Sequence, residues 1–150
     1  PKENRDIPPL NYAWVYRLKR ELPTLEIIIN GGIRDLDACA SHLDHVDGVM
    51  LGREAYQNPW VLAQVDSRFY GTADPVQTPL QVIDSMLAYV DSEVAAGVAL
   101  KHITRHMLGL FAGRPGARRY RRYLSERAHR PGADVQVLHN AVRTLQDLAA

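Results

Sequence analysis

Two glycine turns follow two short apolar runs of this chain, and one helix's length of sequence separates the runs. Leu25 to Ile29 and Val46 to Leu51 are predicted to be buried strands, and residues 35–43 between them have helical apolar spacing. A strand, a helix and a second strand in this order form a unit with parallel strands. The turns Asn30-Gly31-Gly32 and Gly52-Arg53 should therefore emerge as neighbours at the carboxyl edge of one sheet, where α/β proteins bind their ligands.

The two turns together predict a phosphate site. The loops after the seventh and eighth strands of a (β/α)8 barrel commonly hold a phosphate, and glycine lets backbone N–H groups approach the phosphate oxygens closely. Arg53 would add a forked, permanently charged donor. The alternative is that these glycines are ordinary turn residues and that Arg53 pairs with a nearby carboxylate. The spacing alone does not name the ligand.

The length of the chain rules out a complete barrel. Such a barrel takes about 250 residues, whereas this chain has 150 and shows only two convincing strands, both before residue 52. Because it begins with Pro1 rather than Met, we expect a carboxyl-terminal piece of a longer protein. No apolar run approaches the roughly 18 residues of a membrane span, and a single cysteine fits a reducing cytoplasm.

Helical patterns dominate the rest of the chain. A helix is predicted at Tyr12 to Leu22 before the first strand, and another at 60–68 after Arg53. The stretch 71–79 has the composition of a linker, and beyond it no strand is expected. Helices are predicted from Thr78 to Gly97, at 101–111, at 117–128 and after Asp134. The fold class is thus α/β plus all-α, with an α/β part at 1–72 and a small helical bundle at 73–150.

The two parts differ in charge. Residues 1–72 hold 8 Lys and Arg against 10 Asp and Glu, whereas residues 73–150 hold 10 against 7. Five arginines fall within nine residues, at Arg114, Arg118, Arg119, Arg121 and Arg122. Such a run is usually a solvated helix face, but here Glu126 is the nearest carboxylate, and an uncompensated face repels itself. Nucleic acid is the partner that this pattern favours.

Two further features are interpreted as structural. His102 and His106 have the spacing of two metal ligands on a helix, but no third ligand is evident, so capping or core roles are favoured and no metal is expected. Cys39 lies between two alanines in the middle of a predicted helix, which favours packing over reactivity.

Several strings of the sequence resemble the tRNA-dihydrouridine synthases, specifically their A subfamily. The likeness runs from residue 1 to about residue 130, and its most specific parts are GREAYQNP and RPGARRYRR. The matching strings are PKENR (1–5), IPPL (7–10), INGGI (29–33), GVMLGREAYQNP (48–59) and ITRHMLGLFAGRPGARRYRRYLSE (103–126).

The resemblance implies an FMN-binding TIM-type (β/α)8 barrel followed by a helical tRNA-binding domain. Residues 1–72 would then be the last two β/α units of the barrel, and residues 73–150 the helical domain. In this family NADPH reduces the flavin, and a hydride passes to a uridine of the tRNA D-loop, which must be flipped out of its stack. The FMN phosphate would be held by Asn30, Gly31, Gly32, Gly52 and Arg53, and the tRNA would be bound by Lys2, Arg5, Arg118 and Arg121.

The family's catalytic cysteine, which acts as a general acid, belongs to an earlier barrel segment, and Cys39 does not match its motif. The resemblance therefore implies no catalytic residue in this chain, which alone should be inactive. It implies no stable protein partner. Two rivals stand beside this reading: a stand-alone tRNA-binding module without catalysis, and another phosphate-binding barrel enzyme that shares only the glycine turns.

Overall fold

The computed structural model describes residues 9–146, and these divide into two compact units with the division between Ala55 and Tyr56. Lys2 and Arg5, which were predicted to bind tRNA, lie outside the described residues. The predicted boundary between residues 72 and 73 concerns the domains of a complete barrel protein, and it stays a prediction. None of the described helices combines the length and apolar character that a membrane-spanning segment needs.

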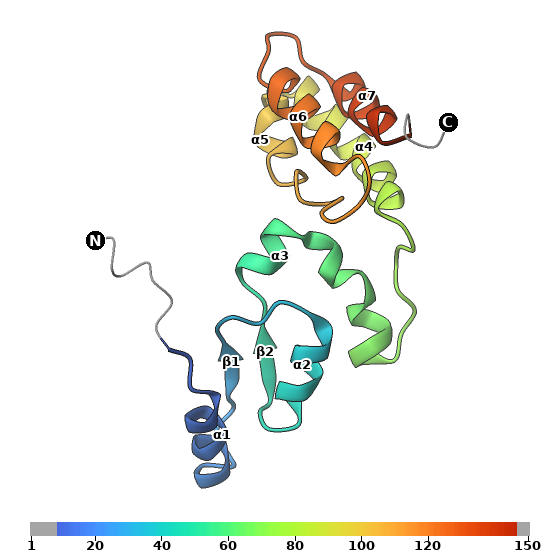
Figure 1. Cartoon of the computed structure of the whole chain (residues 1–150). Helices are drawn as coiled ribbons and strands as arrows, with labels where there is room; N and C mark the ends of the chain where they lie inside the picture. Colours follow the sequence, from blue (N-terminus) through green and yellow to red (C-terminus); the bar gives the residue numbers. More distant parts are fainter. Residues whose placement is uncertain (1–8, 147–150) are drawn as a thin grey trace, which may run out of the picture. The chain divides into compact units, whose positions relative to one another are not determined.

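The first unit contains the predicted strand, helix and strand, preceded by one helix (Figure 1). Helix α1 (Tyr12–Glu21) leads to strand β1 (Ile28–Asn30), helix α2 (Leu36–Leu43) and strand β2 (Gly48–Met50). The strands pair in parallel, with Ile28 opposite Gly48 and Asn30 opposite Met50. They are shorter than predicted because a ladder forms only where both strands pair, and among the described residues each strand has one neighbour.

Local chemistry explains where α2 begins. The carboxylate of Asp35 accepts a hydrogen bond of 2.7 Å from the backbone N–H of Ala38, so Asp35 is the N-cap. The buried side of the helix carries Leu36, Cys39 and His42. Ile29 of β1 is also buried in this unit, as are Ile27, Ile33 and Val46 from the segments between the elements. The packing role expected for Cys39 agrees with this position.

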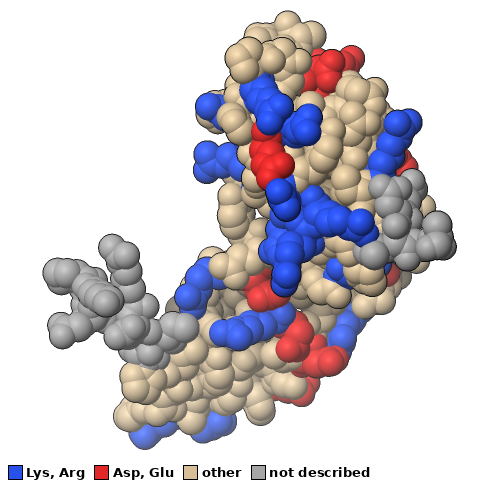
Figure 2. All heavy atoms as spheres, turned by 45° about the horizontal axis from the view of Figure 1, so that its top comes forward, with Lys and Arg blue, Asp and Glu red and all other residues tan. Residues whose placement is uncertain are grey.

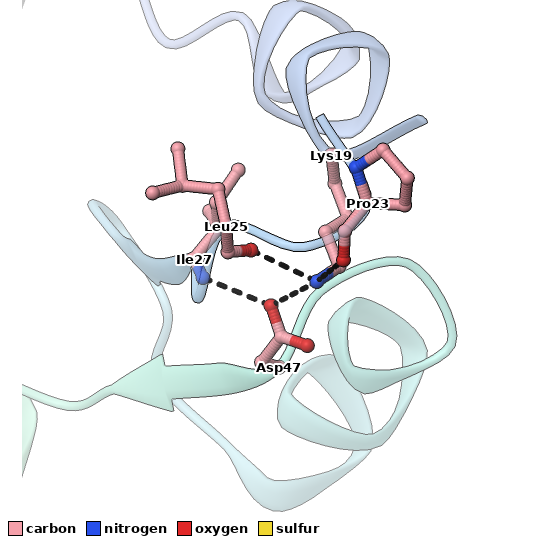
Figure 3. Close-up of polar contacts among 5 residues, drawn as sticks. All are labelled: Lys19, Pro23, Leu25, Ile27 and Asp47. Atoms are coloured by element: carbon pink, nitrogen blue, oxygen red, sulfur yellow. Dashed lines mark hydrogen bonds and ion pairs between the residues drawn. The ribbon is translucent and has the colours of Figure 1, made fainter. Parts of the chain in front are cut away.

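Lys19 and Asp47 tie α1 to the starts of both strands (Figure 3). The Lys19 ammonium lies 2.7 Å from the Asp47 carboxylate and donates hydrogen bonds of 2.9 Å to the carbonyls of Pro23 and Leu25. Asp47 also accepts a hydrogen bond of 2.9 Å from the backbone N–H of Ile27. The amino-terminal edge of the sheet is thus held by one charged cluster, at the opposite edge from the glycine turns.

The second unit is helical, and its first part departs from the prediction. Helix α3 (Arg53–Gln57) crosses the division between the units. In place of an α-helix at 60–68 there is a 3₁₀ helix, η2 (Pro59–Gln64), followed by a π-helical turn, η3 (Asp66–Tyr70). Asn58 is the N-cap residue of η2, although its side chain makes no capping hydrogen bond. Gly71 ends the turn in the left-handed conformation.

The remaining helices pack around one hydrophobic core. They are α4 (Pro79–Ala95), α5 (Leu100–Thr104), α6 (Ala117–Arg127) and α7 (Val135–Gln146). Thr78 and Gln81 form a capping box at the start of α4, and Asp134 accepts a hydrogen bond of 2.9 Å from the N–H of Gln136 at the start of α7. Fully buried core side chains include Val90, Leu100, Tyr120, Leu124 and Leu138.

The helix predicted at 101–111 is wrong beyond Thr104, where successive turns replace it. Their hydrogen bonds join residues three apart, for example from the N–H of Leu110 to the carbonyl of Met107. The physical reason is a close approach at Gly109, where a Cβ atom would lie 2.0 Å from the carbonyl oxygen of Gln57. His102 and His106 therefore do not share one helix, and His106 packs edge-on against Tyr56 at a ring distance of 5.7 Å.

Candidate functional site

The two glycine turns leave the sheet at the same edge. Because β1 and β2 are parallel and Asn30 is opposite Met50, residues 31–32 and 51–53 follow directly from paired strand ends. Asn30, Gly32, Gly52 and Arg53 are exposed, and Gly31 is half-buried. The strand, helix and strand pattern predicted this juxtaposition.

Only glycine fits the first turn. Gly31 has a φ of 127° and Gly32 a φ of 67°, which side-chain-bearing residues rarely adopt. A Cβ atom would also lie 2.9 Å from the Leu10 side chain at Gly31, and 2.8 Å from it at Gly32. The two glycines therefore leave room for the Leu10 side chain, and the turn carries no side chain of its own at the carboxyl edge of the sheet. Backbone without side chains is compatible with close approach of phosphate oxygens.

Arg53 has its charge available at this edge. It is exposed and forms no ion pair with any residue between 9 and 146. The alternative that it serves only to pair with a carboxylate thus has no support in the described part of the chain. Arg53 directly follows the second glycine turn, and an exposed guanidinium can bind an anionic group in a forked geometry. The types of residue present therefore fit a phosphate.

The predicted arginine cluster of the second unit lies on and next to α6. All five of the predicted cluster are exposed, whereas Tyr120 and Leu124 of the same helix are buried. This helix therefore has a charged, exposed face and a core face. Figure 2 shows that Lys and Arg side chains gather into a patch on the face of this unit that it presents.

The arginines differ in how far their charge is neutralised. The guanidinium of Arg122 lies 2.7 Å from the Glu126 carboxylate, a hydrogen bond that lowers the pKa of Glu126. Arg114 lies over the ring of Trp60, 5.2 Å from its centre. By contrast, within the part of the chain that the structure describes, Arg118, Arg119 and Arg121 take part in no ion pair.

The start of α6 adds to the positive potential of this surface. Arg118 and Arg119 lie in the first turn, which holds no acidic residue, and the N-cap Gly116 makes no side-chain capping bond. The helix dipole places partial positive charge at this end, so cations here are unfavourable by about 0.3–1 kcal/mol each unless an anion is near. Both features therefore favour an anionic partner for α6.

No metal site is found among the described side chains. Among residues 9–146 there is no group of three or more His, Cys, Asp or Glu side chains that could hold a metal ion. The charged cluster of Lys19 and Asp47 and the hydroxyl of Tyr12, which contacts the first glycine turn, were not found by sequence reasoning. Both link residues that are far apart in the chain, and no local pattern signals them.

Comparison with known proteins shows which family this chain matches. Residues 1–148 match the family model described as Dihydrouridine synthase (Dus). Over 147 residues, 98% of this chain, the sequence is 55% identical to a tRNA-dihydrouridine(20/20a) synthase of Escherichia coli (strain K12), of which it covers 43%. A protein of the same description from Shewanella oneidensis (strain MR-1) is 55% identical over 151 residues, 100% of this chain and 45% of that protein. The one from Vibrio cholerae is 52% identical over 142 residues, 95% of this chain and 43% of that protein. The chain thus spans less than half the length of these curated relatives.

Proposed function

Because this chain belongs to the dihydrouridine synthase family, we propose that it is the carboxyl-terminal part of a cytoplasmic tRNA-dihydrouridine synthase of the A subfamily. The complete enzyme would reduce a uridine of the tRNA D-loop to 5,6-dihydrouridine, with FMN as cofactor and NADPH as reductant. The observation that carries the proposal is 55% identity to a named tRNA-dihydrouridine(20/20a) synthase over 98% of this chain. The exposed arginines of α6 and the glycine turns add physical support.

The glycine turns and Arg53 would hold the FMN phosphate. When bound, the flavin supplies hydride transfer, which no side chain can perform. The part of this chain is to fix the flavin by its phosphate: backbone of Gly31, Gly32 and Gly52 would approach the oxygens, and Arg53 would offset their charge. The general acid that protonates the uridine would come from outside this chain, which alone would be inactive.

The first unit has the surfaces expected of two β/α units taken from a TIM-type barrel. Its strands each lack a second neighbour among the described residues, where adjacent barrel strands would pair. Helix α1 buries no residue, although Trp14, Leu18 and Leu22 form an apolar face, and Trp14 is 65% exposed. In a closed barrel such a face packs against neighbouring elements. Packing against neighbouring barrel elements would account for the exposed apolar face of α1.

The second unit would bind the tRNA through α6. Arg118 and Arg121 are exposed, unneutralised by described residues, and three apart on one helical face. Arginine meets phosphate oxygens in the forked geometry that a tRNA backbone offers. Because the target uridine is stacked in folded RNA, the helical unit would grip the tRNA while the barrel takes the flipped base.

The test is an absorbance spectrum of the complete synthase between about 300 and 550 nm, repeated after NADPH is added without air. A flavin band that bleaches on addition is the expected result. A colourless protein that still binds tRNA would refute the enzyme and favour a tRNA-binding module. A flavin band that NADPH does not bleach would refute the proposed reductant.

The phosphate grip is tested by replacing Arg53 with Ala in the complete synthase. Loss of a charged hydrogen bond to the phosphate should weaken FMN binding by roughly 10- to 100-fold. The measurement is a titration of apoprotein with FMN, followed by quenching of flavin fluorescence. Arg20→Ala is the matched control, because Arg20 is exposed on α1 at its last turn. FMN affinity equal to that of the unmodified synthase would contradict the role of Arg53.

A further inference from the structure

We propose that Tyr12 is a positioning residue for the flavin phosphate, acting through the first glycine turn; the inference rests on the proposed function. Tyr12 is the first residue of α1 and is half-buried. Its hydroxyl donates a hydrogen bond of 2.6 Å to the carbonyl oxygen of Gly31, 19 residues away in the chain. Tyr12 is not one of the residues proposed to bind the phosphate, so a residue outside the phosphate site holds the turn.

The bond to Gly31 controls the direction of a backbone donor. The carbonyl of Gly31 and the N–H of Gly32 belong to one peptide group, and in a trans peptide the two point in opposite directions. Because Tyr12 holds the carbonyl on the side of α1, the N–H of Gly32 must point away from α1. Two adjacent glycines could otherwise rotate this peptide with little steric resistance. The hydroxyl therefore selects the orientation in which the N–H is presented at the edge of the sheet.

Tyr12 is itself held in place. Its ring packs edge-on against His42, with ring centres 4.5 Å apart and an angle of 72° between the planes. His42 is buried, and its Nδ1 lies 2.6 Å from the hydroxyl of Tyr16. The turn also packs against the side chain of Leu10, two residues before Tyr12 in the chain. The donor of the key hydrogen bond thus has a fixed ring, which lowers the entropy lost when the turn closes on an anion.

The test compares two flavins that differ only in the phosphate, FMN and riboflavin, on the complete synthase and its Tyr12→Phe variant. The variant keeps the ring that packs on His42 and removes only the hydroxyl. We expect the Kd for FMN to rise about 5- to 10-fold, the effect of one hydrogen bond, and the Kd for riboflavin to stay within about twofold. Tyr89→Phe, which removes the hydroxyl of a tyrosine exposed on α4, should change neither value.

The outcomes distinguish failure of the role of Tyr12 from failure of the proposed function. An unchanged FMN affinity in Tyr12→Phe would overturn the inference, and so would an equal loss for both flavins, which would mark Tyr12 as a support of the fold alone. If the unmodified synthase binds FMN no more tightly than riboflavin, the phosphate site itself is refuted. If it binds neither flavin, the proposed function fails.

Discussion

Asp47 connects α1 to the segment before β1 through an ion pair and a hydrogen bond. Its carboxylate receives the Lys19 ammonium from α1 and the N–H of Ile27 from the start of β1. The hydrogen bond from Lys19, and next the one from Ile27, lower the pKa of Asp47 below its ordinary value of 3.8. The ionised carboxylate therefore stabilises the folded unit more than the neutral one does.

The sign of this shift predicts a pH dependence of stability. Because the pKa is lower in the folded protein, the contribution of Asp47 is fully present above about pH 4 and is lost as the pH falls through the lowered pKa. Asp47→Asn should lower the Tm at neutral pH, and the difference from the unmodified protein should shrink below pH 4. Thermal unfolding of the complete synthase across this range measures it. Asp91→Asn, at an exposed position of α4, is the control; a difference in Tm that does not vary with pH would contradict the assignment.

Single residues were predictable from sequence where their chemistry is local. The helix starts at Thr78 and Asp134 were predicted, and each of these residues accepts a hydrogen bond from a backbone N–H two or three residues later. The partners of Tyr12 and Lys19 were not predictable, because each bond joins positions that only the folded chain brings together. The residues that orient the candidate site are thus harder to predict from sequence than the glycines that form it.

At the scale of elements, the turns after α5 show how tertiary contact overrides helix propensity. Residues 101–111 have helical apolar spacing, yet α5 stops at Thr104. Leu110 and Phe111 still reach the core through a chain of tight turns. The approach of Gly109 to the Gln57 backbone is a contact between distant positions, so periodicity could not predict it. Helices α4 and α7 begin at residues with capping hydrogen bonds and α6 follows a turn at Gly116, and all three lie close to their predicted bounds.

Gly109→Ala tests whether this approach is required. A Cβ atom at Gly109 would lie 2.0 Å from the Gln57 oxygen and 3.2 Å from Pro59, so backbone must move. Since Gly109 does not have a positive φ, the effect is one of space alone. We expect a loss of about 1–3 kcal/mol in unfolding free energy, the usual cost of overpacking.

Denaturant unfolding of the complete synthase measures the effect of Gly109→Ala, with Ala112→Ser as the control. Ala112 is exposed in the same run of turns, so its change should stay within about 0.5 kcal/mol. Equal stability of Gly109→Ala and the unmodified protein would show that the turns can shift without cost.

At the scale of the whole molecule, the sequence pattern was sufficient to predict that a parallel strand pair and a helical region follow one another, and that two glycine turns share a sheet edge. It could not predict that α1 leaves Trp14, Leu18 and Leu22 exposed, because amphipathicity shows which face is apolar and not what covers it. The chain spans less than half the length of the relatives that it matches.

The charge of the helical unit predicts a salt-dependent grip on tRNA. Each phosphate contact that releases a counterion contributes about 0.7 to 0.9 to the slope of log K against log salt. Replacing both Arg118 and Arg121 with Gln should weaken tRNA binding and lower the magnitude of that slope by about one to two units. The measurement is binding of tRNA to the complete synthase between about 50 and 200 mM salt.

Arg122→Gln is the matched control for the salt experiment, since it removes one charge from the same helix. The Arg122 guanidinium already lies 2.7 Å from Glu126, so its loss also leaves that carboxylate unpaired. If only net charge mattered, Arg122→Gln would reduce the slope about half as much as the double variant. If phosphates are bound by the unneutralised arginines, Arg122→Gln should leave the slope nearly unchanged. A double variant that keeps the slope and the affinity of the unmodified synthase would remove α6 from the tRNA surface.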